Sequence, residues 1–247
     1  MHKRTVVACA RVADDSATHQ YVQTFATTTA GLCALNAWLA QHGVTHVAME
    51  ATGVYWKPVW HMLEGDFELV LANAAHIKNV PGRKTDANDS MWIADLFAHG
   101  LIRASFVPPT PTQEMRDHTR TRKQLVRERA SHVLRIQKTL EDANLKFAGV
   151  ITDIMGKSGR AILNALVAGE SDPMKLADLA EGRLKSKRFE LIEACDGRIR
   201  QHHRSMLELH LGLIDALDSA IEKVDAFLGK ALDSERSLVL CCERFRA

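Results

Sequence analysis

A cluster of prolines near the middle of the chain divides it into two parts. Pro108, Pro109 and Pro111 are half of the six prolines in the sequence. Proline lacks a backbone N–H and clashes with the preceding helical turn, so neither a helix interior nor a central strand tolerates this run. We therefore expect a domain boundary at residues 107–112. It separates a domain over residues 1–107 from a second over 113–232, which is followed by a tail over 233–247.

Strand and helix signals alternate before the boundary. Short segments rich in β-branched and apolar residues occupy 5–12, 21–27, 44–51 and 67–72. Segments of helical composition occupy 32–42, 55–63 and 85–99. Strands that alternate with helices predict an α/β domain in which helices flank the sheet.

Two apolar stripes predict long helices after the boundary. The first contains Val126, Ala130, Val133, Ile136, Leu140, Ala143 and Phe147. The second contains Leu207, His210, Ile214, Leu217, Ile221, Val224 and Leu228. Spacings of three and four are typical of coiled-coil helices, so we expect an all-helical coiled-coil arm that folds back on itself or pairs between subunits. His210 interrupts the heptad, and we expect a buried neutral histidine or a register device there.

Composition excludes several classes of protein. Charged residues make up 25% of the chain and hydrophobic residues 46%, which are values of a folded protein. No apolar run approaches the ~20 residues that a bilayer requires. The five cysteines are scattered and form no CxxC pair, which favours reduced thiols over a disulfide framework or a zinc site. We therefore expect a cytoplasmic protein without a membrane segment.

Three carboxylates stand out by position. Glu50 ends an apolar strand, where an acid is unfavourable unless it is paired or functional. Asp86 and Asp89 open a helix three residues apart and share one face. Such a set could hold Mg²⁺, which prefers oxygen ligands. An aspartate at a helix N-terminus is also favoured by the helix dipole alone, so the spacing leaves both interpretations open.

Longer segments carry a family resemblance. The stretches VAMEATGVYWKPVWHML, ANAAHIKNVPGRKTDANDSMWIADLFAHGLI, ASFVPP and HHRSMLELHLGLIDALDSAI resemble transposases of the IS110 type. The resemblance implies a RuvC-like domain with an RNase H-type sheet and an Asp-Glu-Asp-Asp tetrad that holds two Mg²⁺ ions. The tetrad's last three members fall on Glu50, Asp86 and Asp89, which are therefore the expected catalytic and metal-binding residues.

The resemblance also implies partners and a reaction. Members of the family cleave and rejoin DNA, guided by a structured RNA from the element itself, and we expect a dimeric or tetrameric homo-oligomer. Two departures affect this chain. The tetrad's first aspartate would lie just before Met1, and none of the serines matches the nucleophile motif of the family's second domain. One metal ligand is therefore missing from this sequence, and we expect either that the true start lies upstream of Met1 or that the chain is a partial or inactive copy.

Basic residues are the candidates for nucleic-acid contacts. The segment 113–147 carries nine basic against five acidic residues, although the whole chain has a net charge of only +2. The predicted phosphate-binding residues are Arg83, Lys84, Arg116, Arg120, Arg122, Lys123 and Arg127. A solvated helix face is the alternative. Among the histidines, His202 and His203 are adjacent and project about 100° apart on a helix, so we do not expect them to share a metal.

The leading hypothesis is a Mg²⁺-dependent transposase or recombinase that acts on DNA phosphodiester bonds. Two other functions remain open. One is a non-catalytic oligomer that binds nucleic acid through the helical arm. The other is a RuvC-like structure-specific nuclease without transposition.

Overall fold

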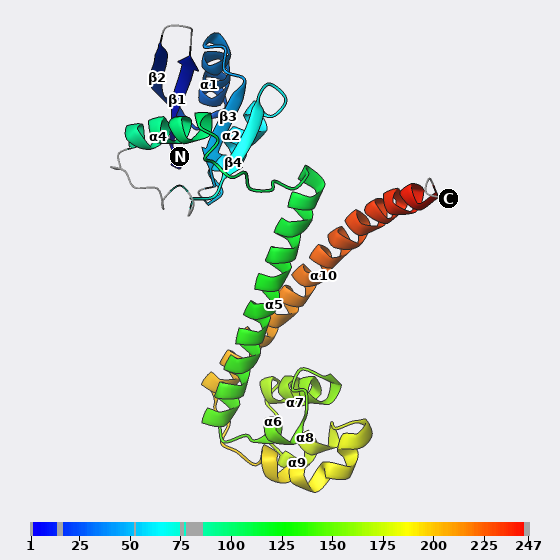
Figure 1. The fold of residues 1–247 in the computed structure, drawn as a ribbon. Coiled ribbons are helices and arrows are strands. Elements are labelled where there is room, and N and C mark those ends of the chain that lie inside the picture. Colours follow the sequence, from blue (N-terminus) through cyan, green and yellow to red (C-terminus); the bar gives the residue numbers. More distant parts are fainter. Residues whose placement is uncertain (1, 14–16, 52, 75–76, 78–85, 245–247) are drawn as a thin grey trace. The chain divides into compact units, whose positions relative to one another are not determined.

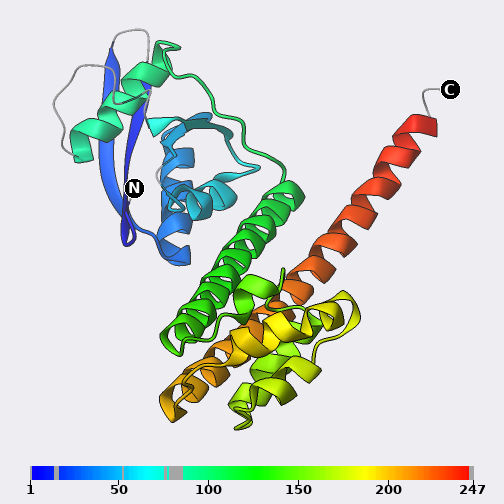
Figure 2. The same cartoon turned by 90° about the horizontal axis from the view of Figure 1, so that it is seen from below.

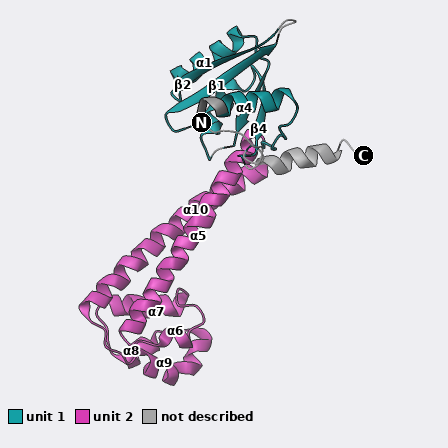
Figure 3. Ribbon diagram, turned by 60° about the vertical axis from the view of Figure 1, so that its left-hand side comes forward, with its two compact units in different colours: residues 1–108 teal, residues 109–247 magenta. Residues whose placement is uncertain are grey.

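The computed structural model describes residues 2–13, 17–51, 53–74, 77 and 86–244, with the side chains of 86–88 and 234–244 outside the description. The chain divides into two compact units, residues 1–108 and 109–247 (Figure 3). The elements of unit 1 are β1 (Thr5–Ala13), β2 (Thr18–Ala26), α1 (Thr29–Gln41), β3 (His46–Glu50), α2 (Trp56–Leu63), β4 (Glu68–Ala72) and α4 (Asp86–Ala98). The order of strands and helices follows the predicted alternation, and an α/β class is confirmed for this part of the chain.

The strands of unit 1 form two pairs. β1 and β2 are antiparallel, with Thr5 opposite Ala26 and Ala13 opposite Thr18. β3 and β4 are parallel, with His46 opposite Glu68. Among the described residues these pairs are separate two-stranded sheets. The single RNase H-type sheet expected from the resemblance is therefore not present as one hydrogen-bonded sheet in this part of the chain.

The core of unit 1 lies between the strands and the helices α1 and α2. Val6 of β1 and Phe25 of β2 pack with the buried face of α1, which includes Leu35. Alternate residues of a strand point to opposite faces, so the other face of the β1–β2 pair is left for α4 (Figure 1). The close approach of α1 to β2 needs Gly31, because a Cβ there would lie 2.3 Å from the carbonyl oxygen of Ala26.

Unit 2 is entirely helical in its described part. Its elements are α5 (Thr110–Asp142), α6 (Phe147–Val150), α7 (Lys157–Val167), α8 (Pro173–Asp178), the 3₁₀ helix η1 (Gly182–Lys187), α9 (Arg188–Cys195) and α10 (Gln201–Arg244). α5 and α10 lie side by side, and the short helices pack at one end of this pair (Figures 1 and 2). None of the described helices is both long enough and apolar enough to cross a membrane.

Both ends of the helical segment differ from the prediction. α5 begins at Thr110, inside the proline-rich segment, and accommodates Pro111 in its first turn, where the missing N–H has no helical partner to lose. At the other end, α10 continues to Arg244 through most of the segment 233–247 predicted as a separate tail. Prolines therefore mark where the helix starts, whereas the weak apolar pattern of the tail did not reveal that the helix continues.

The core of unit 2 forms where the short helices meet α5 and α10. Ile136 of α5, Leu163 of α7, Leu191 of α9 and Leu207 of α10 are all fully buried there. Ile136 and Leu207 belong to the two apolar stripes found in the sequence. The stripes therefore meet within one chain over this part of the helices.

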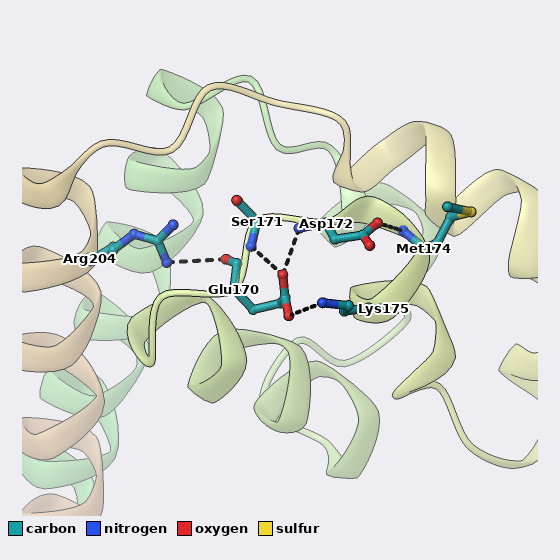
Figure 4. Close-up of polar contacts among 6 residues, drawn as sticks. All are labelled: Glu170, Ser171, Asp172, Met174, Lys175 and Arg204. Atoms are coloured by element: carbon teal, nitrogen blue, oxygen red, sulfur yellow. Dashed lines mark hydrogen bonds and ion pairs between the residues drawn. The ribbon is translucent and has the colours of Figure 1, made fainter.

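The turn between α7 and α8 is held to α10 by polar contacts (Figure 4). The carboxylate of Glu170 accepts hydrogen bonds from the backbone N–H groups of Ser171 and Asp172, each at 2.9 Å. The N–H of Asp172 and then that of Ser171 lower the pKa of Glu170 below its usual value. The guanidinium of Arg204 donates to the Glu170 carbonyl oxygen at 3.1 Å and also to that of Leu166. These bonds satisfy the carbonyl groups left at the end of α7.

Candidate functional site

Glu50 is the last residue of β3. The strand fixes its direction through parallel pairing with β4, in which Glu50 lies opposite Ala72. Its neighbour Met49 is buried against the core of unit 1, so Glu50 projects to the opposite face. Glu50 itself is half-buried.

Asp89 lies in the first turns of α4 and is also half-buried. The backbone of Asp86 starts the same helix, but its side chain lies outside the described residues. The predicted phosphate-binding residues Arg83 and Lys84 lie outside them altogether. The structure therefore locates two of the three predicted carboxylates, Glu50 and Asp89.

A cavity of about 700 Å³ brings these two carboxylates to one space. β1, β3 and α4 contribute to its lining, which includes Glu50 and Asp89. Apolar side chains such as Val47 and Ile93 line the same space. Oxygen donors in a partly apolar cavity suit a hard divalent cation, because charges interact more strongly where the local dielectric is low.

α4 is fixed over this cavity by Asp95. Its Oδ1 atom accepts hydrogen bonds from Nε of Arg11 at 3.0 Å and from Nε2 of Gln20 at 2.8 Å. Arg11 and Gln20 are cross-strand partners in the β1–β2 pair, so both strands hold the same carboxylate. Sequence reasoning did not identify this contact, because no spacing along the chain links β1, β2 and α4.

The cavity also contains a thiol, that of Cys9. Burial raises the pKa of Cys9 above its ordinary value, and the charge of Asp95 raises it further against the opposing effect of Arg11. The thiol is therefore protonated at neutral pH and is a poor nucleophile.

Four of the predicted nucleic-acid-binding residues lie together on α5. Arg116, Arg120, Lys123 and Arg127 are all exposed. On a helix their spacing places them within about 60° of one another. They span about 16 Å along the axis at 1.5 Å per residue. We call this set the α5 basic face. Arg120 also lies 3.6 Å from Asp117.

Arg122 differs from these four because it pairs with α10. Its guanidinium makes a two-pronged contact with the carboxylate of Asp225, in which Nη2 lies 3.1 Å from Oδ2. The hydrogen bond and charge of Asp225 raise the pKa of Arg122 above its usual value. One heptad later, Arg129 makes the same contact with Asp218. The equal spacing of the two arginines and the two aspartates was the sequence signal for this antiparallel register. A phosphate would have to displace Asp225 to bind Arg122.

A group of two histidines and one aspartate lies where α5 ends and α10 begins. The donor atoms of Asp142, His202 and His203 are within 4.8 Å of one another, closer than helix geometry suggested for adjacent histidines. Nε2 of the buried His203 lies 2.8 Å from Oδ2 of Asp142, and its Nδ1 accepts the backbone N–H of Arg200. The hydrogen bond from His203 lowers the pKa of Asp142.

The hydrogen bonds of His203 determine whether this group of two histidines and one aspartate can bind a metal. Because Nδ1 of His203 accepts a hydrogen bond from the backbone N–H of Arg200, the neutral ring carries its proton on Nε2, which donates it to Asp142 and is therefore not available to a metal. The bond from Arg200 also satisfies an N–H group at the start of α10. The arrangement therefore ties α5 to the N-terminus of α10 and does not present a preformed metal site.

Comparison with known proteins bears on the first unit and the start of the second. A family model described as a transposase, of the IS110 DEDD type, matches residues 1–145. The match spans the cavity with Glu50 and Asp89 and the whole of α5, including the α5 basic face. None of the curated proteins matches the chain.

Proposed function

The chain belongs to the IS110 family of DEDD transposases, and from this premise we propose that it cleaves and transfers DNA phosphodiester bonds with Mg²⁺. The observation that supports the proposal is that Glu50 and Asp89, from separate elements, line one cavity. Asp86 opens the helix that carries Asp89 and completes the proposed set.

The residues of the cavity have distinct proposed roles. Carboxylate oxygens of Glu50, Asp86 and Asp89 would hold the cation. Bound Mg²⁺ supplies Lewis-acid stabilisation of the phosphate and lowers the pKa of an attacking water. The Asp95 contacts with Arg11 and Gln20 keep α4, and with it Asp89, in place against the strands.

Metal binding tests this proposal most directly. We expect Mn²⁺, used as a spectroscopic substitute for Mg²⁺, to bind the chain, and Glu50→Gln or Asp89→Asn to weaken binding by at least about tenfold, since even the partners of metal ligands contribute that much. Metal-dependent cleavage of labelled DNA should decrease in the same two variants. Glu64→Gln is a matched control, because Glu64 is an exposed acid of the same unit outside the cavity lining. Equal Mn²⁺ affinity in the wild type and both cavity variants would contradict the proposal.

A second candidate function is nucleic-acid binding without catalysis, which the α5 basic face favours. Four exposed cations along one helix face suit a run of backbone phosphates. Strong DNA or RNA binding by a chain that neither binds Mn²⁺ nor cleaves DNA would support this function. Cleavage of branched DNA without strand transfer would instead indicate a structure-specific nuclease.

We also propose an element-encoded structured RNA and further copies of the chain as partners. The α5 basic face supports the first, since structured RNA presents closely spaced phosphates. Exposed apolar residues on α10, namely Met206, Leu209 and Leu213, support the second, because spacings of three and four place them on one face. Sedimentation of the chain with and without RNA tests both partners.

A further inference from the structure

A basic segment that ends in an exposed aromatic ring lies among the short helices of unit 2. Residues 183–189 read RLKSKRF and contain four basic residues and no acidic one. They form most of η1 and the start of α9. The family match ends at residue 145, before this segment begins. The match therefore assigns no role to it.

Hydrogen bonds and packing hold η1 in place. Just before its start, the backbone N–H of Glu181 donates to Oγ of the buried Ser158 on α7 at 2.9 Å. Just after its end, Nε of Arg188 donates to Oδ1 of Asp178 on α8 at 2.6 Å. Between these contacts, Leu184 packs against the core of unit 2. The segment is therefore fixed to α7, α8 and the core before any ligand binds.

Two cations of η1 project away from this core. A 3₁₀ helix has about three residues per turn, so the side chains of Arg183 and Lys185 point about 120° to either side of Leu184. Both are exposed. Among the residues that the structure describes, neither forms an ion pair, whereas Lys187 lies 3.9 Å from Glu190. Arg183 and Lys185 can therefore bind phosphate without displacing a described carboxylate.

Phe189 follows these cations and is 83% exposed. α9 buries Leu191 in the core, and residues two apart on a helix project about 200° apart, so Phe189 points outward. A single exposed apolar side chain is ordinary on a protein surface. An exposed aromatic ring next to exposed cations is the combination with which proteins bind single strands, because phosphates attract the cations and bases stack on the ring.

The segment has the length of a short run of nucleotides. From Arg183 to Phe189 the chain advances at most about 12 Å, at about 2.0 Å per residue of a 3₁₀ helix. At about 3.4 Å per nucleotide in a stacked strand, roughly three to four nucleotides cover this length. The two cations and the ring can therefore contact one short strand.

We propose that residues 183–189 bind single-stranded DNA, with phosphates on Arg183 and Lys185 and one unpaired base stacked on Phe189. The assignment rests on the proposed function in one respect, since a transposase acts on DNA, which favours a DNA strand over RNA. It does not involve the carboxylates of the cavity.

The first test compares strands with and without bases. Fluorescence anisotropy measures binding of three labelled 12-mers to the full chain, namely oligo(dT), oligo(U) and an abasic DNA strand, in EDTA so that no metal is held at the cavity. Phe189→Ala should weaken binding of oligo(dT) by about 5- to 150-fold, the loss typical of one stacked base. Phe189→Tyr keeps an aromatic face and should bind like the wild type. The abasic strand should bind the wild type and both variants equally.

The second test measures the salt dependence of oligo(dT) binding. Replacing both cations, in Arg183→Gln/Lys185→Gln, should reduce the slope of log affinity against log salt by about 1.4, because each phosphate contact to a single strand contributes about 0.7. Lys223→Gln/Lys230→Gln is the matched control, since both are exposed lysines of α10, and should retain the wild-type slope. All variants should melt like the wild type, because the replaced side chains are exposed.

These measurements can overturn the proposal in several ways. Unchanged oligo(dT) binding in Phe189→Ala, an equal loss with the abasic strand, or an unchanged salt slope in the double variant of Arg183 and Lys185 would each do so. A loss in Phe189→Ala seen only with oligo(U), or only with phosphatidylserine vesicles as a further probe, would assign the surface to RNA or to a membrane instead. Each of these results leaves the test of Mn²⁺ binding unaffected, so the proposal can fail while the proposed function stands.

Discussion

His210 shows how one residue connects the two long helices of unit 2. It is 7% exposed and stands in the apolar stripe of α10. Its Nδ1 lies 3.2 Å from Nδ1 of His132 on α5, a hydrogen bond that requires at least one neutral ring. Burial lowers the pKa of His210, and the charges of His132 and Arg135 lower it further. The sequence-based expectation of a buried, neutral histidine agrees with this environment.

The lowered pKa predicts that acid destabilises unit 2. The unfolded chain takes up a proton at His210 near its ordinary pKa of 6.5, whereas the folded chain does so only at lower pH. Stability is therefore fully present above pH 6.5 and falls as the pH drops toward the folded pKa. We expect the melting temperature to be lower at pH 5 than at pH 7.5, because protons bind the unfolded chain more tightly than the folded one at His210.

Thermal melting followed by circular dichroism checks this dependence. His210→Leu should flatten the profile between pH 7.5 and 5, since leucine suits the heptad position. His118→Gln is the control and should retain the wild-type slope, because His118 is an exposed histidine of α5, outside the contact between His132 and His210. An equal slope in His210→Leu and the wild type would assign the pH dependence to other groups.

At the scale of elements, α5 serves two purposes through two faces. One face pairs with α10 through Arg122 and Arg129, whose partners are Asp225 and Asp218. The other is the α5 basic face. It also consists of basic residues, but these are exposed and do not pair with these two aspartates. Two arginines five residues apart, Arg122 and Arg127, thus have different predicted roles because a helix turns about 100° per residue.

This difference gives opposite expectations for two alanine variants. Arg127→Ala should reduce the slope of log affinity against log salt for duplex DNA by about 1, the loss of one phosphate contact, and leave stability unchanged. Arg122→Ala should retain the slope and lower the melting temperature of unit 2 only slightly, because water and salt screen an exposed ion pair. Salt titrations of DNA binding and thermal melts of both variants check this, and a reduced slope in Arg122→Ala would place Arg122 in the nucleic-acid surface.

At the scale of the whole molecule, two separate cores divide the chain. The core of unit 1 is drawn from residues 6–107 and that of unit 2 from residues 133–214. The division follows the proline cluster, whereas the family match continues past it to residue 145 and includes α5. The part of the chain characteristic of the family therefore extends beyond one folding unit.

Separate cores predict that the units fold independently. Fragments covering 1–108 and 109–247 should each unfold cooperatively, and their circular dichroism spectra should add to that of the full chain. Urea titration of the two fragments and of the full chain tests this. A fragment that is unfolded on its own would show that its core depends on the other unit.

Much of the secondary structure could be predicted because its signals are local. The strand at 5–12 and the helix at 85–99 differ from β1 and α4 by no more than one residue at either end. The sequence did not predict that α10 continues to Arg244. The last turns of the helix carry no sustained row of apolar residues at the spacing of three and four that reveals a packed helix face. Within the candidate site, Glu50 and Asp89 were identified from position and resemblance, whereas Arg11, Gln20 and Asp95 were not.

The sequence by itself determined the periodic features and the family, because helix and strand repeats and the motif around Glu50 are written in consecutive residues. Only the tertiary structure decided that Glu50 and Asp89 line one cavity, that Arg122 faces Asp225, and that the ring of His42 after α1 stacks on Tyr21 of β2. The physical reason is distance along the chain. A backbone repeat fixes the directions of neighbouring side chains, but contacts between distant residues depend on how whole elements pack.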